Sequence, residues 1–505
     1  MRVVHCILKY TILVLALSAA VPPAVAETGG FGRAVARIDR VLREVRKVEH
    51  GPPGLAVIMV VRGYEPVIRT YGVRSIESGE PFTANTPFYI ASMSKSYTGL
   101  LAACLDRKGI FKLDSPLAAV WPDLKMAKGI DPSAITVRQW MVHEAPLANS
   151  TLGFRTAYVG PVGAKAFPGI LSRYSSPRHG GFEYSNTGYL VYGAALETKT
   201  HRSFRAWFKR IVLDGLRLAH TATRSSAYPA GTMSSGHFWD GKTWRVFPPK
   251  PDALMHPAGD VVTTPRDMAR WLIANMNESG GDIPHAPFVA AHTARQPTTK
   301  DRYGFKCDGY ALGWYTCSYD AMRILSHGGG YTGVRSLETV SVGQGVGFAV
   351  FSNSDAGNLE FMTDLTKVFL DAWAGTKPRQ SPPQFTAAFE KRFHARIANE
   401  AMQVKRIRAK PVWGGWRWHP SGMRLKRYAG TYRSPRLGDM VVTSTGNGLI
   451  AALGLMTFRL APAKPDWFAA VAGDDDRPAP FHFMRGAGGA LSALYWGSRK
   501  FRRVK

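Results

Sequence analysis

Three short segments of the chain hold residue types that together can perform nucleophilic catalysis. In order they are Ser92-Met93-Ser94-Lys95, Tyr184-Ser185-Asn186 and His327-Gly328-Gly329-Gly330. A serine hydroxyl is a weak nucleophile unless a base lies within hydrogen-bond reach. At the start of a helix, residues three apart share a face, so Lys95 can act as that base if burial keeps its amine deprotonated. The spacing therefore predicts an activated serine at Ser92.

The remaining groups in these segments suit the other tasks of acyl transfer. The phenol of Tyr184 can relay a proton, which leaves open whether Lys95 or Tyr184 is the base. The side chain of Asn186 offers a donor and an acceptor to a substrate amide. The backbone amide of Ser92 and an amide from the glycines after His327 can together bind an oxyanion.

Elements that could position these groups are visible in the hydrophobic pattern. An apolar stretch precedes Ser92, and the apolar run from Tyr97 to Leu105 predicts a buried helix after it. Strand patterns lie at both ends of the first 375 residues, and helical patterns dominate between them. These strands are predicted near Ala56–Val61, Val67–Tyr71, Ala311–Cys317, Arg335–Val340 and Val346–Phe351. We expect an α/β fold in which one antiparallel sheet is flanked by helices and joined by a helical lobe, with the site at their junction.

At these motifs the sequence resembles the class C type β-lactamases, D-alanyl-D-alanine carboxypeptidases, D-aminopeptidases and related esterases. The resemblance covers roughly residues 35 to 375 and includes Gly51–Val57, Thr86–Ser96, Tyr184–Tyr189, Pro257-Ala258-Gly259, Thr264–Ala269, Leu312-Gly313-Trp314 and His327-Gly328-Gly329. It implies Ser92 as acylated nucleophile and Lys95 with Tyr184 as the proton-handling pair. It further implies substrate-binding roles for Asn186, His327, Gly329 and Gly330, with Gly330 as the second oxyanion amide.

One departure from the family pattern bears on the substrate. His327 stands where true β-lactamases of this class usually have lysine, and Gly328 lacks the hydroxyl that usually follows. We expect His327 to be only partly charged near neutral pH, so that it binds a substrate carboxylate less well than lysine would. The sequence therefore favours hydrolysis of peptide amides or esters over efficient hydrolysis of β-lactams.

The leading hypothesis is an exported serine hydrolase that forms an acyl-enzyme, of the D-aminopeptidase, carboxypeptidase or esterase type, with weak β-lactamase activity as a further option. The alternative is a non-catalytic relative that keeps the fold and binds cell wall or polyanion. We expect no cofactor, and no cluster of His, Cys and Asp has metal-ligand spacing.

Composition divides the chain into four parts. Residues 1–26 resemble a signal peptide, with a basic start, a short apolar run and Ala24-Val25-Ala26 before the cleavage point, which predicts a periplasmic or secreted protein. Residues 27–375 form the predicted hydrolase domain. Residues 376–424 are predicted as a linker with an amphipathic helix, and residues 425–505 as a small all-β domain.

Cys307 and Cys317 flank Asp308-Gly309-Tyr310, which is typical of a turn. In an oxidising compartment these two cysteines can form a disulfide, but nothing in the sequence fixes their separation, so both states stay open.

The formal net charge of +29 is unusual. It favours polyanionic partners, which for an exported protein are cell-wall polymers or lipid headgroups. The alternative is compositional bias spread evenly over the surface. No nucleic-acid-binding module is recognisable.

Overall fold

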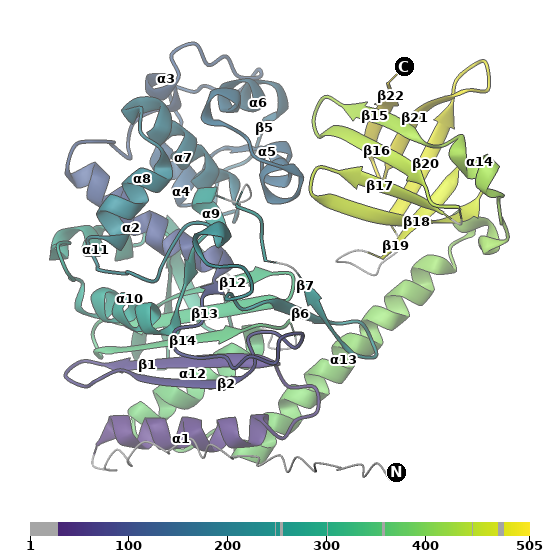
Figure 1. The fold of residues 1–505 in the computed structure, drawn as a ribbon. Coiled ribbons are helices and arrows are strands. Elements are labelled where there is room, and N and C mark those ends of the chain that lie inside the picture. Colours follow the sequence, from purple (N-terminus) through teal and green to yellow (C-terminus); the bar gives the residue numbers. More distant parts are fainter. Residues whose placement is uncertain are drawn as a thin grey trace, which may run out of the picture.

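The computed structural model describes residues 29–247, 249–252, 256–299, 301–355, 359–446, 448–472 and 479–504. The predicted signal peptide, residues 1–26, lies outside the described residues. The chain forms a helix-covered sheet with a helical lobe, followed by a long helix and a β-barrel (Figure 1).

The central sheet has eight strands, and each hydrogen-bonded neighbour pair is antiparallel. Strands from both ends of the hydrolase segment pair with each other, because β1, the second strand from one edge, lies beside β14. In spatial order the strands are β2 (Val67–Gly72), β1 (Gly54–Val61), β14 (Val346–Ser352), β13 (Val334–Ser341), β12 (Met322–Tyr331), β11 (Tyr315–Tyr319), β10 (Lys306–Tyr310) and β9 (Gln296–Pro297). The predicted α/β class with an antiparallel sheet is confirmed.

Helices cover both faces of this sheet, as two neighbouring residues of β14 show. The backbone at Gly347 faces Leu272 of α10 (Pro265–Asn277), whereas Phe348 stacks on Phe369 of α12 (Leu359–Trp373). Successive strand residues point to opposite faces, so α10 and α12 lie on opposite sides. The helix α1 (Gly30–Val45) packs against α12 on the same side, and α13 (Pro382–Arg408) packs against α1 in turn. This double cover explains why β1 and β14 are buried along their whole length.

The helical lobe lies between these strand groups in sequence. Its buried centre is α7 (Thr187–Thr200), and it packs closely on α4 (Val137–Met141) because Gly188 has no β-carbon to overlap the carbonyl oxygen of Trp140. The other helices of this region are α2 (Ser94–Arg107), α3 (Leu117–Val120), α5 (Ser150–Phe154), α6 (Phe167–Tyr174), α8 (Phe204–Phe208), α9 (His256–Gly259) and α11 (His285–His292). Short strand pairs accompany them: β3 (Phe88–Tyr89) with β8 (Val262–Thr263), β4 (Leu147–Ala148) with β5 (Ser176–Pro177), and β6 (Gly236–Trp239) with β7 (Trp244–Phe247).

The C-terminal part is a closed barrel, so the predicted all-β domain is confirmed in class. Its eight strands are β15 (Gly430–Ser434), β16 (Gly438–Ser444), β17 (Leu449–Leu453), β18 (Met456–Lys464), β19 (Trp467–Ala472), β20 (Ala479–Arg485), β21 (Leu491–Trp496) and β22 (Arg499–Arg503). Alternate residues point inward and fill the interior, as Leu449, Ala451 and Leu453 do along β17. The short helix α14 (Gly422–Lys426) precedes the barrel.

The connection between sheet and barrel is mostly helical. Phe385, Phe389 and Phe393 of α13 are buried against the sheet domain, as their spacing of four residues predicts, whereas Ala401 is exposed. Beyond α13, Trp413 is buried against Ala463 of the barrel. The chain thus attaches the helix to one domain at its start and to the other just after its end.

The cysteine segment differs from the sequence prediction in one respect. Asp308-Gly309-Tyr310 is not the turn but belongs to β10, where the register shifts at a bulge, and the turn follows at residues 311–314. Cys307 lies directly opposite Cys317 in the strand pair, and the two form a disulfide. Within the described residues, no helix combines the length and apolar character needed to cross a membrane.

Candidate active site

Ser92 lies in a single 3₁₀ turn, Ala91–Met93, between β3 and the start of α2. Ala91 just before it has φ of 49°, a left-handed conformation that non-glycine residues rarely adopt. The hydroxyl of Ser94 holds this turn: it donates to the Ala91 carbonyl at 2.6 Å and accepts from the amide of Val261 at 3.0 Å. The strained turn presents Ser92 at the edge of the sheet while the helix behind it stays buried.

Lys95 is completely buried, and its amine has three polar neighbours. Nζ lies 2.7 Å from Asn186 Oδ1, 2.8 Å from the Ala258 carbonyl oxygen and 3.2 Å from Ser92 Oγ. Burial lowers the pKa of Lys95 well below its usual range. A neutral amine has two hydrogens and one lone pair. Because Asn186 Oδ1 and the Ala258 carbonyl can only accept, they take the two hydrogens and leave the lone pair for the hydroxyl of Ser92.

The phenol of Tyr184 completes this group. Its ring lies under the Lys95 amine, with Nζ 5.1 Å from the ring centroid, and its hydroxyl interacts with the side chain of Ser92. Burial raises the pKa of Tyr184 well above 10, although the contact with Ser92 opposes this shift. Tyr184 therefore keeps its proton at neutral pH and is placed to donate it.

His143 fixes the loop that presents Tyr184 and Asn186. Its carbonyl accepts a hydrogen bond from the Glu183 amide at 3.0 Å, and its ring Nδ1 accepts one from the Ser185 amide at 3.2 Å. Because Nδ1 accepts, the proton of the neutral ring is on Nε2. Burial lowers the pKa of His143 well below its usual value. These contacts give His143 a structural role in this loop.

The glycines of β12 allow that strand to lie against the turn that contains Ser92. A β-carbon at Gly329 would overlap the carbonyl oxygen of Ile90, and the hydroxyl of Ser336 on β13 donates to this same carbonyl at 2.8 Å. Gly330 follows in the strand and faces the side chain of Arg335. The structure thus brings Gly329 and Gly330 to the nucleophile turn, where a backbone amide can face a developing oxyanion.

The environment of His327 differs from the sequence expectation. The side chain is completely buried, and burial lowers its pKa to about 3. Its Nδ1 donates to the Gly328 carbonyl at 2.8 Å, so its Nε2 is free to accept from the hydroxyl of Tyr310 at 3.3 Å. His327 is therefore neutral, not partly charged near neutral pH. A direct contact with substrate would require its ring to leave these partners.

Two groups near the site were not identified from the sequence. The Ala258 carbonyl on Lys95 comes from Pro257-Ala258-Gly259, which was recognised as a motif without a stated role. Glu338 on β13 is fully buried behind the nucleophile helix, and burial raises its pKa to about 8. Trp271 Nε1 donates to its Oε2 at 2.8 Å, and Ser96 Oγ lies 2.7 Å from its Oε1. Glu338 lies in the predicted strand Arg335–Val340, in which every residue from Ser336 on is buried, and the sequence gives no other signal for it.

A cavity of about 380 Å³ opens beside the catalytic group on the side of the helical lobe. Tyr184 and Asn186 line it together with His143 and Arg178, and Ser150 and Phe154 of α5 form its outer end. The cavity thus reaches the catalytic group at Tyr184 and Asn186, whereas Ser92 and Lys95 do not line it.

Comparisons with known proteins agree with this geometry. Residues 38–372 match the Beta-lactamase family. A beta-lactamase of Yersinia enterocolitica is 27% identical over 236 residues, which are 45% of this chain and 56% of that protein. The chain spans less than two thirds of the length of the curated relatives that it matches first, namely 59% and 56%.

Two solved structures share the fold. A penicillin-binding protein homologue from Pyrococcus abyssi superposes with a TM-score of 0.57 at 18% identity, covering 93% of this chain and 99% of that one. The D-amino acid amidase from Ochrobactrum anthropi superposes with a TM-score of 0.56 at 20% identity, covering 67% of this chain and 99% of that one. The family match extends over the sheet and the helical lobe that together hold Ser92, Lys95 and Tyr184, so this chain belongs to the Beta-lactamase family of serine hydrolases.

Proposed function

We propose that the protein hydrolyses a peptide amide or an ester through an acyl-enzyme on Ser92. The observation that supports this most directly is the arrangement around Lys95, whose two acceptor neighbours leave its lone pair facing Ser92 Oγ. A purely binding relative would have no need for a buried lysine without a carboxylate partner, because burying an unpaired cation is costly.

In the proposed reaction, Ser92 Oγ attacks the substrate carbonyl carbon and its proton passes to Lys95 Nζ. The amides of Ser92 and Gly330 stabilise the oxyanion. Tyr184 donates its proton to the leaving nitrogen or oxygen and is reprotonated from Lys95, which completes acylation. Water then attacks the ester carbonyl while Lys95 accepts its proton. The ester bond breaks, Lys95 returns the proton to Ser92 Oγ, and the acid product leaves. Asn186 donates from its amide nitrogen to the substrate, because its oxygen is bound to Lys95.

The neutral state of His327 favours certain substrates within this class. A buried neutral imidazole gives no positive charge at the place where lysine would bind a carboxylate. Because a carboxypeptidase substrate also has a free carboxylate, we rank D-aminopeptidase and esterase chemistry first, and carboxypeptidase action and β-lactam hydrolysis after them. The D-amino acid amidase that shares this fold makes D-amino acid amides the first substrates to test.

The direct test is labelling of the full chain with a fluorophosphonate, followed by intact-mass measurement. We expect one adduct on the wild-type protein and none on Ser92→Ala. The matched control is Ser150→Ala, which removes an exposed serine at the outer end of the same cavity and should leave the adduct in place. Folded wild-type protein that forms no adduct would contradict the proposal.

We further propose that the protein is exported to the periplasm or the cell exterior. The disulfide between Cys307 and Cys317 supports an oxidising compartment, since such bonds rarely persist in a reducing cytosol. Intact mass of protein recovered outside the cytoplasm should show loss of the first 26 residues and, without reductant, two fewer hydrogens than the reduced form. A full-length protein with two free thiols at these positions would exclude export.

A further inference from the structure

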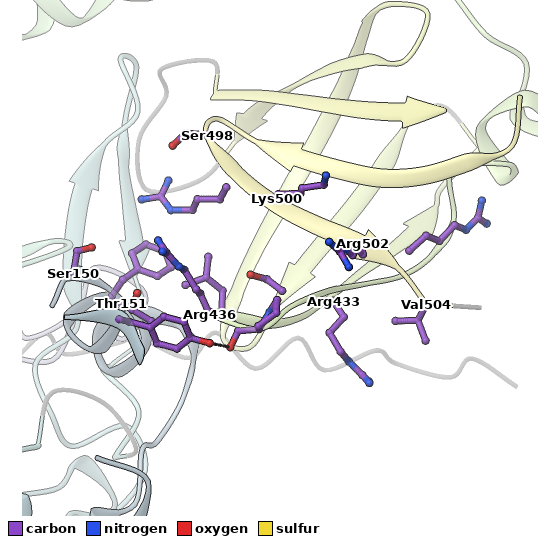
Figure 2. Close-up of a pocket in the computed structure, with 15 residues that line it drawn as sticks. Ser150, Thr151, Arg433, Arg436, Ser498, Lys500, Arg502 and Val504 are labelled. Atoms are coloured by element: carbon purple, nitrogen blue, oxygen red, sulfur yellow. Dashed lines mark hydrogen bonds between the residues drawn. The ribbon is translucent and has the colours of Figure 1, made fainter. Parts of the chain in front are cut away.

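A deep groove separates the barrel from the helical lobe, and basic side chains line its barrel side (Figure 2). Its volume is about 1010 Å³. Figure 2 shows Ser150 and Thr151 on the lobe side, facing Lys500, Arg502 and Arg433 on the barrel side. Of the described residues that line the groove, six are arginine or lysine and none is aspartate or glutamate. The groove therefore attracts anions.

The barrel strand β22 directs several of these charges outward. Phe501 points into the barrel, so its neighbours Lys500 and Arg502 point away from it and are exposed. Of the lining cations, Arg433 is paired with Asp439 at 2.7 Å. Lys500 and Arg502 are available to an external anion.

Two further arginines are held by aromatic rings of the lobe and barrel. The guanidinium of Arg436 lies 5.4 Å from the ring centroid of Tyr174 on α6. The guanidinium of Arg499 lies 5.0 Å from that of Phe154 and 4.8 Å from that of Trp496. A guanidinium stacked on a ring keeps its N–H edge free for a phosphate or carboxylate. The rings thus position these cations without neutralising them.

The groove adjoins the cavity beside the candidate active site. A cavity of about 720 Å³ along the barrel shares Lys500, Arg502 and Arg503 with the groove. At the other end, Ser150 and Phe154 line both the groove and the 380 Å³ cavity, which Tyr184 and Asn186 also line. The three cavities thus lie in a row that leads from the barrel surface toward Tyr184 and Asn186. We call the basic residues along it, Arg436, Arg499, Lys500, Arg502 and Arg503, the basic track.

We propose that the basic track binds a linear chain with closely spaced phosphate or carboxylate groups, and that it directs a part of this chain into the cavity beside Tyr184. Binding of the chain to the basic track does not depend on the proposed function, whereas placing a bond of that chain at Ser92 for hydrolysis rests on it. A membrane fits the geometry less well, because a flat surface of headgroups cannot follow a recessed groove into a cavity of 380 Å³.

The binding test uses full-length Ser92→Ala protein, which prevents turnover, and fluorescence anisotropy with labelled inorganic polyphosphate. A second arm uses labelled polyglutamate, so that phosphate and carboxylate recognition are distinguished. The test variant is Lys500→Gln with Arg502→Gln. The matched control is Lys426→Gln with Arg459→Gln, which removes the same charges from exposed positions of α14 and β18 outside the track.

We expect the track variant to weaken binding of at least one of these chains by about tenfold at low salt and to lower its salt dependence. The control variant should change affinity by less than about twofold. Equal losses in both variants, or no binding of either chain, would overturn the proposal in favour of evenly spread charge. Track-dependent binding to anionic phospholipid vesicles with no binding of soluble chains would overturn it in favour of a membrane surface.

Continuity with the active site has a separate readout in protein with intact Ser92. Unlabelled polyphosphate should raise the KM of a small neutral ester without lowering kcat, because the bound chain occupies the cavity entrance, and the track variant should reduce this effect. Binding of polyphosphate without an effect on KM would overturn the part of the proposal in which the bound chain reaches the cavity beside Tyr184. If no ester is hydrolysed at all, the hydrolase proposal fails while the anisotropy result still decides the track.

Discussion

Among the residues that the structure describes, no carboxylate forms an ion pair with Lys95, and its pKa is lowered by burial alone. Tyr184 beside it shows the opposite shift from the same cause, because burial disfavours the charged form of each group. The pKa values of two residues that ordinarily nearly coincide are therefore shifted apart, with that of Lys95 below that of Tyr184. We therefore propose Lys95 as the group that accepts the serine proton and Tyr184 as the group that gives one to the leaving group.

This assignment predicts the pH dependence of acylation. If Lys95 is the base, the second-order rate of fluorophosphonate labelling rises through the lowered pKa of Lys95 and is then flat up to about pH 10, because Tyr184 keeps its proton over this range. If tyrosinate were the base, the rate would still rise at the alkaline end. The rate should be measured across this range with stable protein.

Tyr184→Phe provides the matched comparison. We expect it to lower turnover of a substrate with a poor leaving group by about 10²-fold, since leaving-group protonation is lost, and to leave the pH at half-maximal labelling unchanged. A profile whose rising limb disappears in this variant would assign the base to Tyr184 instead.

Glu338 joins three elements behind the site: its own strand β13, the nucleophile helix α2 and the covering helix α10. The hydroxyl of Ser96 lies 2.7 Å from both the Met93 carbonyl and Glu338 Oε1, but it has a single hydrogen. A protonated Glu338 resolves this, because Glu338 donates to Ser96, Ser96 donates to Met93, and Trp271 donates to the other carboxyl oxygen. The network therefore fits a neutral carboxyl.

The raised pKa of Glu338 predicts how stability changes with pH. The unfolded chain loses this proton near its ordinary pKa of 4.5, whereas the folded protein keeps it until about 8. The unfolded state is therefore favoured as pH rises from 4.5 to 8, and wild-type stability falls over this window. Glutamine can make the same contacts without a proton to lose. Glu338→Gln should thus be more stable than wild type near the upper end of the window by a few kcal/mol, as about 1.4 kcal/mol corresponds to each pKa unit.

Urea unfolding of both proteins at the two ends of the window measures this difference. Glu65→Gln is the control, because Glu65 is exposed in the turn between β1 and β2. A wild-type protein that loses no more stability than Glu338→Gln across the window would show that Glu338 is ionised in the fold.

At the scale of the whole molecule, some features could be predicted from sequence and others could not. The apolar strand patterns were sufficient to predict the sheet and the all-β C-terminal part. The three motifs were sufficient to predict that Ser92, Lys95 and Tyr184 lie together. The neutral environment of His327 was not predictable, since it depends on Tyr310 and other rings from separate segments. The bulge in β10 was also missed, because Asp308-Gly309 has the same composition in a bulge as in a turn.

The groove between barrel and lobe was beyond sequence reasoning for a similar reason. Its basic residues lie far along the chain from α5 and α6. They face the lobe because contacts between the two domains hold the barrel there, such as the hydroxyl of Tyr174, which donates to the Pro435 carbonyl at 2.9 Å. The Leu455 amide likewise donates to the Val159 carbonyl at 3.2 Å. Charge count alone indicates attraction to anions, whereas only the arrangement of the two domains indicates where an anion would lie.

The helix α13 connects these domains with 27 residues, buried at its start and exposed farther on. A helix couples distance to rotation, because each added residue lengthens it by about 1.5 Å and turns the next part of the chain by about 100°. A one-residue insertion in its exposed half would therefore rotate the barrel away from Val159 and Tyr174, while seven residues would nearly restore its angle but displace it by about 10 Å. Length variation between the two domains is thus restricted by helical phase, a restriction that a flexible linker would not impose.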